Sequence, residues 1–196
     1  MSNISKPESF LRLIKFDIEN IKHFIDNLSV YEWNEWPYRQ NKYEKEHKNT
    51  QTYPLVWSDD DNLIDNTEIF VIKKNIKSEV WEYITPILDY LCKKYNGIVI
   101  KCMFVKLHKK SFVLEHKDYG FSLTESHRIH IPIKTNKNVM FYISNVPYNF
   151  EEGYAYEINN QKLHSVKNNS NFDRIHLIID ILPKSSNIKV ISSDKE

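Results

Sequence analysis

Residues 97–182 consist of short runs of β-branched and aromatic residues, and this pattern constrains the fold more than any other feature of the chain. The runs are GIVIKCMFVKL, SFVLEH, RIHIPIKT, VMFYIS, YAYEIN, KLHSV and RIHLIIDIL. Turn signals separate them, among them Glu152-Gly153 and Asn159-Asn160. Short strands with such connections are typical of an antiparallel jelly-roll or barrel.

The first 96 residues have a different pattern. The segment FLRLIKF predicts a strand, and the apolar spacing that follows Asp17 predicts a helix over residues 17–28. A second helix is predicted between Ser78, as its N-terminal cap, and Gly97, as its stop. Residues 31–53 are aromatic and charged without a clear period, and predict a long loop or arm.

We therefore expect a mainly β protein with N-terminal helices. One domain is expected over residues 1–196, with a helical and loop part to about residue 96, a β core over about 97–183 and a tail over 184–196. Helices should cover one sheet of the core.

Charge and hydropathy argue against several classes of partner. Lys and Arg total 27 and Asp and Glu total 26, so no global field favours nucleic acid or an anionic membrane. The sequence has neither a signal-peptide pattern nor an apolar run long enough to span a membrane. We expect a soluble cytoplasmic protein with a small or locally recognised partner; its oligomeric state stays open.

The segment LEHKDYG contains the first candidate ligands. His116 and Asp118 lie two residues apart, so in a strand both side chains point to the same face. By itself this pair is explained equally well by a solvated strand end. His164, in another short β run, completes a set of two histidines and one carboxylate, which is the facial triad of non-haem Fe(II) oxygenases. The same ligands with a water would also suit a zinc hydrolase.

Arg174 favours the oxygenase. It begins the last strand run, ten residues after His164. A guanidinium is always charged and binds carboxylates through two parallel hydrogen bonds, so it suits the distal end of a dicarboxylic co-substrate. A zinc hydrolase has no obvious need for such a group.

The tripeptide Arg-Ile-His occurs twice, at residues 128–130 and 174–176. Strand alternation places the arginine and histidine of each copy on one face and the isoleucines on the other. In an ordinary sandwich the isoleucines would point inward and the polar residues into solvent. In a barrel with a liganded interior the polar face would line the lumen, and the isoleucines would pack outward against helices. The candidate triad favours the second arrangement.

Four segments together are similar to the aspartyl/asparaginyl β-hydroxylase family of Fe(II)/2-oxoglutarate-dependent dioxygenases. They are LEHKD, HRIHIPIKTN, YEINNQKLHSVKNNS and DRIHLIID, and the resemblance covers about residues 97–182. It implies a double-stranded β-helix, the cupin-like jelly-roll. It also implies Fe(II), 2-oxoglutarate as co-substrate and O₂.

The resemblance implies a role for each candidate residue. Iron would be held by His116, Asp118 and His164, and Arg174 would bind the far carboxylate of 2-oxoglutarate. Two further residues, Arg128 and His130, match positions that line the co-substrate end of the pocket.

One departure concerns co-substrate binding. Some members of the family carry a hydroxyl residue about eleven positions before the first ligand histidine, where this chain has Val105. Another residue would then assist Arg174. The presence of Asp118 completes the triad and favours hydroxylation over halogenation.

The resemblance implies hydroxylation of an unactivated C–H bond, with release of succinate and CO₂. The substrate would be an Asp or Asn side chain in a peptide, or a free amino acid such as proline. A non-catalytic cupin-like module that binds a metal or ligand is the alternative.

Two further histidines and one aromatic segment are interpreted from the sequence. His47 is interpreted as a surface residue rather than one near the pocket mouth, and His176 as a hydrogen-bonding neighbour on the face of Arg174. The aromatic segment YEWNEWPYRQ is either a substrate lid or packing over the barrel.

Overall fold

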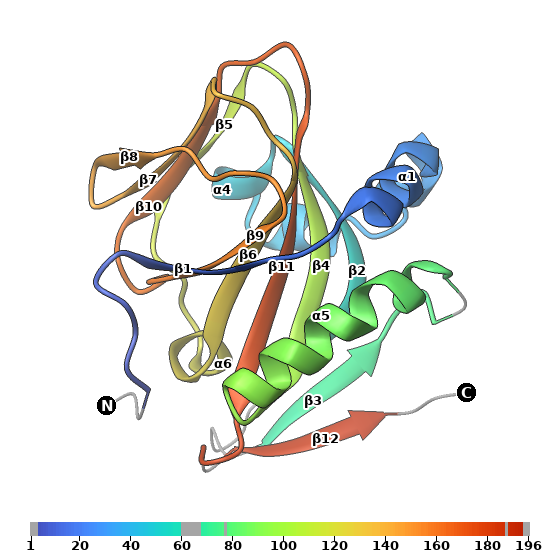
Figure 1. The fold of residues 1–196 in the computed structure, drawn as a ribbon, viewed down its shortest axis with the longest axis vertical. Helices are drawn as coiled ribbons and strands as arrows, with labels where there is room; N and C mark the ends of the chain where they lie inside the picture. The colour runs from blue at the N-terminus through green and yellow to red at the C-terminus, as the bar shows by residue number, and fades with distance from the viewer. Residues whose placement is uncertain (1–3, 60–67, 77, 187, 194–196) are drawn as a thin grey trace.

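The computed structural model describes residues 4–59, 68–76, 78–186 and 188–193, and two β-sheets dominate this part of the chain (Figure 1). The larger sheet has the order β1-β9-β6-β11-β4-β2-β3-β12, and the smaller has the order β5-β10-β7-β8. The larger sheet contains β1 (Phe10–Lys15), β2 (Thr50–Asp59), β3 (Glu68–Lys73), β4 (Gly97–Leu107), β6 (His127–Lys134), β9 (Tyr154–Ile158), β11 (Arg174–Pro183) and β12 (Lys189–Ser193). The smaller contains β5 (Ser111–His116), β7 (Val139–Ile143), β8 (Val146–Tyr148) and β10 (His164–Asn168).

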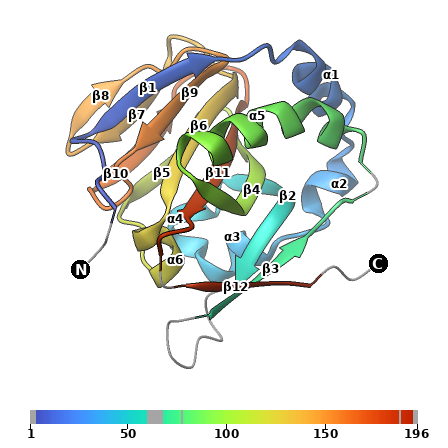
Figure 2. The same cartoon turned by 60° about the horizontal axis from the view of Figure 1, so that its bottom comes forward.

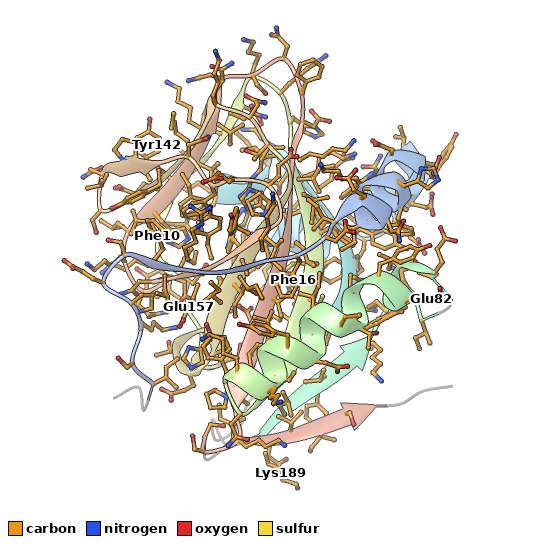
Figure 3. All side chains as sticks on the ribbon, viewed as in Figure 1. Phe10, Phe16, Glu82, Tyr142, Glu157 and Lys189 are labelled. Atoms are coloured by element: carbon orange, nitrogen blue, oxygen red, sulfur yellow. The ribbon has the colours of Figure 1, made fainter. Side chains whose placement is uncertain are left out.

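Each of the seven runs predicted after residue 97 forms a strand, so the predicted jelly-roll is confirmed. Side chains from both sheets meet in one aromatic and aliphatic cluster, which includes Leu107 of β4, Val113 of β5 and Phe141 of β7. Figure 3 shows side chains filling the space between the sheets, among them Phe10 of β1. We call this space between the sheets the lumen.

Helices lie on both sides of the larger sheet. Two of them, α1 (Glu19–Asn27) and α5 (Val80–Lys94), cover its outer face (Figures 1 and 2). The described residues also form four short helices: α2 (Val30–Asn34), α3 (Tyr38–Lys42), α4 (Glu44–His47) and α6 (Phe121–Glu125). Among the described residues, no helix has the length and apolar character needed to cross a membrane.

The outer face of the larger sheet is aliphatic. On this face the buried residues of β6 are Ile129, Ile131 and Ile133, and those of β11 include Leu177 and Ile179; all five belong to one core with α1 and α5. Burial of each such side chain contributes about 1.5–3 kcal/mol. The prediction that these residues pack outward against helices is confirmed.

The opposite face of the same strands lines the lumen. It carries Arg128 and His130 on β6 and Arg174 and His176 on β11, and all four are buried. The alternative with these residues in solvent is therefore wrong. The sheet has two buried faces of opposite chemical character.

Sequence patterns missed strands at both ends of the chain. The predicted helical and loop part contributes β2 and β3 as well as β1, and the tail contributes β12, parallel to β3. Both faces of β2 are buried, so its sequence does not alternate, and Pro54 interrupts it where the pairing with β4 shifts register. Residues 187 and 194–196 of the tail lie outside the described residues.

The two predicted helices are confirmed as α1 and α5. The predicted cap of α5 is wrong. Its N-cap is Glu79, and no side chain caps this end of the helix with a hydrogen bond. The predicted loop over 31–53 instead contains α2, α3, α4 and the start of β2.

Candidate metal centre and active site

The three predicted metal ligands come together at one end of the smaller sheet. His116 ends β5, His164 begins β10, and the two are paired across the strands. Asp118 follows β5, and its backbone N–H donates to the carbonyl of Asn160 at 3.1 Å. One nitrogen or oxygen from each of the three residues lies within 4.8 Å of the others. This distance suits ligands of a single ion.

Backbone hydrogen bonds orient both imidazoles. Nδ1 of His116 donates to the carbonyl of Leu114 at 2.8 Å, and Nδ1 of His164 donates to that of Lys162 at 2.9 Å. Because Nδ1 carries the proton, Nε2 keeps its lone pair for a metal. Burial and the neighbouring His164 lower the pKa of His116, which favours the neutral form that a metal requires.

Arg128 holds the carboxylate of the group. Its Nη1 donates to Oδ2 of Asp118 at 2.6 Å, while Nε and Nη2 donate to the two oxygens of Asp180 at 2.8 and 2.7 Å. Burial, the largest single effect, would raise the pKa of Asp118, but the charges of Arg128, His164, His116 and Arg39 together outweigh it and lower that pKa well below its usual range. Asp118 is therefore an ionised carboxylate with a fixed orientation.

The role expected for Arg128, to line the co-substrate end of the pocket, stays a prediction. Its hydrogen bonds in the structure all go to carboxylates. Asp180, which sequence reasoning overlooked, is fully buried and paired with Arg128 across β11 and β6. The available signal was an acidic residue on the same strand face as Arg174, in an otherwise apolar run.

Arg174 has a different environment. Its Nη2 donates to Nδ1 of His176 at 2.6 Å, and its buried Nε has no hydrogen-bond partner among the described residues. No ion pair joins it to a carboxylate in that part of the chain. Burial and the charge of Arg39 lower the pKa of Arg174 to about 9. A buried guanidinium with an unused donor fits an anionic ligand.

His130 lies between the two arginines. Its ring is 5.6 Å from that of His176 and 5.5 Å from that of Phe141, measured between centroids. Burial, and then the charges of Arg174 and Arg128, lower its pKa well below the usual range. His130 is thus a neutral, buried polar group of the lumen.

The position of Val105 leaves Arg174 without a hydroxyl from β4. Val105 is buried and pairs with His176 across the strands. A small cavity beside Arg174 and His176 is lined by Thr135 and otherwise by apolar side chains. Thr135, which follows β6, is the hydroxyl-bearing residue among those that line this cavity, and it also lines the outer groove described below.

Two functional candidates from the arm were not predicted. His47, expected at the surface, is buried, and its ring lies 5.3 Å from that of His116. Nη2 of Arg39 contacts Nε2 of His47 at 3.0 Å. Burial and the charge of Arg128 lower the pKa of Arg39 to about 10. No sequence pattern in the aperiodic segment 31–53 marks these two residues.

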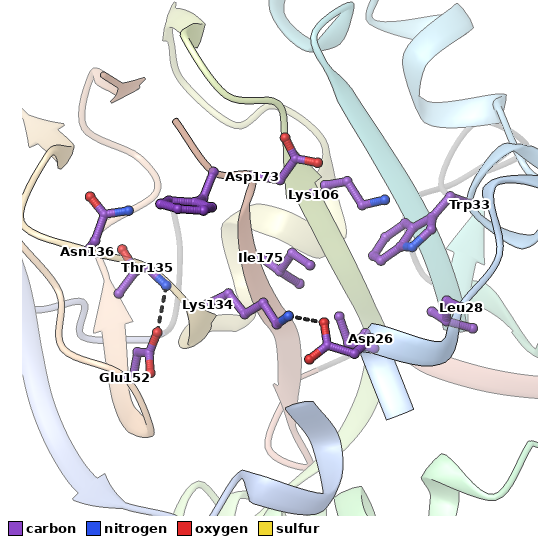
Figure 4. A pocket seen from close by; sticks show the side chains of 12 residues that line it. Asp26, Leu28, Trp33, Lys106, Lys134, Thr135, Asn136, Glu152, Asp173 and Ile175 are labelled. Atoms are coloured by element: carbon purple, nitrogen blue, oxygen red, sulfur yellow. Dashed lines mark hydrogen bonds and ion pairs between the residues drawn. The ribbon is translucent and has the colours of Figure 1, made fainter. Parts of the chain in front are cut away.

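A separate groove lies on the outer side of the larger sheet (Figure 4). Trp33, Lys106 and Ile175 line it, together with the ion pair between Lys134 and Asp26. Ile175 is on the opposite face of β11 from Arg174, so the groove is not part of the lumen. It contains none of the three candidate metal ligands.

A jelly-roll that brings two histidines and one carboxylate together in its lumen has the architecture of a non-haem Fe(II) oxygenase. Comparison with protein families gives the same class. Residues 17–183 match the family described as aspartyl/asparaginyl beta-hydroxylase. The chain belongs to this family and is an Fe(II)/2-oxoglutarate-dependent dioxygenase. The family predicted from sequence is confirmed.

Solved structures support the fold. An oxidoreductase of the 2OG-Fe(II) oxygenase family from Burkholderia pseudomallei has a TM-score of 0.58 at 8% identity, covering 93% of this chain and 89% of that one. The viral collagen prolyl hydroxylase of Paramecium Bursaria Chlorella virus-1, in its 2OG complex, has a TM-score of 0.54 at 8% identity, with coverages of 89% and 96%.

A third structure is a prolyl hydroxylase from Trichoplax adhaerens in complex with a hypoxia inducible factor peptide fragment. Its TM-score is 0.52 at 11% identity, covering 90% of this chain and 84% of that one. At these identities the likeness shows a shared fold. No curated protein matches the sequence significantly.

Proposed function

We propose that His116, Asp118 and His164 bind Fe(II), that Arg174 binds the distal carboxylate of 2-oxoglutarate, and that the enzyme hydroxylates an amino-acid substrate. The observation that carries this proposal is the pairing of a metal-ligand set with a buried arginine that has no carboxylate partner among the described residues. The metal-ligand set suits the metal-chelating end of the co-substrate, and the buried arginine suits its distal carboxylate.

The donor set fits Fe(II). Two neutral imidazoles and one ionised carboxylate leave coordination positions open for a co-substrate and O₂. When bound, iron with 2-oxoglutarate and O₂ supplies the oxidising power needed to attack an unactivated C–H bond. Arg128 keeps Oδ2 of Asp118 engaged, which directs Oδ1 toward His116, 3.8 Å from its Nε2.

Arg174 suits 2-oxoglutarate because its guanidinium donates in a fixed fork. His176 accepts a hydrogen bond from Nη2 of Arg174 and thereby fixes the orientation of the guanidinium. The Nε–H of Arg174 stays available to donate to a carboxylate. We propose that the Thr135 hydroxyl assists Arg174 in the place that Val105 leaves vacant. His130, between Arg174 and the metal ligands, would line the co-substrate's path.

The reaction consumes a substrate C–H, O₂ and 2-oxoglutarate, and yields C–OH, succinate and CO₂. One oxygen atom enters the product and the other enters succinate. The side chains of two of the candidate ligands are largely covered, with an exposure of 13% for His116 and 9% for Asp118, and this limits the access of water to the chemistry. Phe141, stacked on His164 at 6.0 Å between ring centroids, adds an apolar wall.

The substrate class includes an Asp or Asn side chain in a peptide and a free amino acid such as proline. Membership of the family and the peptide held by the Trichoplax adhaerens enzyme support an amino-acid substrate. A non-catalytic binding module is a weaker proposal, because it gives no reason for a complete ligand set beside an unpaired arginine.

Anaerobic spectroscopy tests the proposal. Fe(II) and 2-oxoglutarate should give a visible charge-transfer band that is lost in His116→Ala and His164→Ala. His23→Ala is the matched control, because His23 is exposed on α1. Aerobic assays should detect succinate even without a substrate. Wild-type protein with neither the band nor succinate would rule out the proposed function.

A further inference from the structure

Three arginines are buried around the lumen, and their partners differ. Arg128 is bound by two carboxylates, whereas Arg174 and Arg39 contact histidines and form no ion pair within the described part of the chain. One dicarboxylate spanning the metal and Arg174 satisfies Arg174. The charge of Arg39 is still uncompensated, and a buried cation without an anion is costly.

The arm holds Arg39 firmly in place. On one side Tyr38 stacks with Trp36 and packs edge-on against Trp57 of β2. On the other side Nε2 of Gln40 donates to Oγ1 of Thr52 at 2.9 Å. The aromatic segment therefore packs over the barrel and delivers one cation to its interior.

Arg39 and His47 each have one hydrogen-bond donor without an acceptor among the described residues. Since a guanidinium can only donate, Nε2 of His47 accepts from Arg39, and the proton of neutral His47 is on Nδ1. Nδ1 of His47 and Nη1 of Arg39 are both buried without a partner among the described residues. A carboxylate supplies the negative charge and the acceptor oxygens that this cation and its buried donors lack.

We propose that Arg39 and His47 bind a carboxylate of the primary substrate, so that the enzyme acts on a carboxylate-bearing amino acid. This inference rests on the proposed function and narrows its substrate class. The carboxylate is the α-carboxylate of a free amino acid or the side chain of an Asp residue. Asn and Pro residues inside a polypeptide lack this group.

The location of the pair favours the primary substrate over 2-oxoglutarate. His47 packs edge-on against His116, so Arg39 and His47 approach the candidate metal centre from the arm and β5. Arg174 and His176 approach from β11. A substrate held by Arg39 and His47 would therefore be anchored beside the metal, and the charge of Arg39 also reaches Arg174.

Pairs of compounds that differ only in a carboxylate or an amide test whether the substrate needs a carboxylate. Succinate formation from 2-oxoglutarate is measured with the standard L-amino acids, with their amides, and with N-acetyl-aspartate N-methylamide and its asparagine counterpart. Stimulation should require a carboxylate. Stimulation by free amino acids but not by the blocked aspartate identifies the α-carboxylate as the source, and the reverse identifies an Asp side chain. Equal stimulation by acids and amides would overturn the inference.

Variants test the residues. Arg39→Gln should raise the KM for the stimulating acid by roughly 30-fold or more, the cost typical of losing one partner of a buried charge pair. The same variant should change the KM for 2-oxoglutarate far less, and Arg174→Gln should show the opposite split. Arg39→Lys, which keeps the charge, should recover part of the loss. Arg12→Gln, an exposed arginine on β1, is the control.

Two outcomes contradict the inference without touching the proposed function. In the first, the wild-type protein shows the charge-transfer band and forms succinate, but Arg39→Gln raises the KM for 2-oxoglutarate and not the KM for the stimulating acid. In the second, none of the acids tested stimulates succinate formation, and acetate does not raise the melting temperature of the protein loaded with Fe(II) and 2-oxoglutarate under anaerobic conditions. A misfolded Arg39→Gln is recognised by loss of the band, and His47→Gln then provides the same test.

Discussion

Two regions of the lumen hold buried arginines, and they differ in one respect. In the matched region, Arg128 is bound by Asp118 and Asp180. In the unmatched region, Arg174 and Arg39 lie against neutral histidines, and neither forms an ion pair among the described residues. All three arginines are buried, so exposure alone does not distinguish them.

The presence or absence of carboxylate partners distinguishes an arginine that stabilises the fold from one that is available to bind a ligand. A buried cation with its carboxylates in place is satisfied by the folded chain and stabilises it. A buried cation without them lowers the stability of the free protein and is satisfied by a ligand. We therefore propose that the matched region positions a metal carboxylate and that the unmatched region provides anion sites.

The largest effect should follow from breaking the matched region. Arg128→Met leaves Asp118 and Asp180 buried without their cation, and should lower the free energy of unfolding by about 3–5 kcal/mol. Urea denaturation of the metal-free protein measures it. Arg12→Met, which breaks an exposed ion pair, should cost about 0–1 kcal/mol. Similar losses for the two variants would mean that the matched region is not structural.

Arg174→Met should separate stability from binding. It removes a desolvated cation without leaving a carboxylate unpaired, so the free energy of unfolding of the free protein should stay the same or rise by about 1–2 kcal/mol. The increase in melting temperature caused by 2-oxoglutarate, with Fe(II) under anaerobic conditions, should disappear. A fall in stability comparable to that of Arg128→Met would show that the fold itself satisfies Arg174.

The smallest effect concerns the hydroxyl near Arg174. Thr135→Val removes it at nearly constant volume and should raise the KM for 2-oxoglutarate about tenfold or less, as for the loss of one hydrogen bond of about 1 kcal/mol. In that background Val105→Thr, which restores a hydroxyl from β4, should recover part of the loss. An unchanged KM in Thr135→Val would remove Thr135 from the co-substrate site.

Local sequence patterns predicted the elements whose two faces differ. The seven strands of the core and the outward isoleucines follow from alternation. The proximity of His116, Asp118 and His164 follows from ligand chemistry, because Asp118 lies after the end of β5 and not on the strand that was expected for it. Family resemblance added the fold name and the co-substrate.

Other features depend on pairing that no local pattern encodes. Asp180 becomes the partner of Arg128 only through the register of β6 with β11. Arg39 and His47 belong to an aperiodic segment, which reaches the site because Tyr38 and Gln40 anchor it on β2. The interruption at Pro54 hid β2 in the same way.

The central claim is that the lumen holds a dicarboxylate between the metal ligands and Arg174. The most direct measurement is an anaerobic titration of the Fe(II)-loaded protein with 2-oxoglutarate and with 2-oxobutyrate, which lacks the distal carboxylate, followed by the charge-transfer band. Wild-type protein should bind 2-oxoglutarate roughly 30-fold or more tightly than 2-oxobutyrate, and Arg174→Met should bind both equally weakly. An unchanged preference for 2-oxoglutarate in Arg174→Met would contradict the claim.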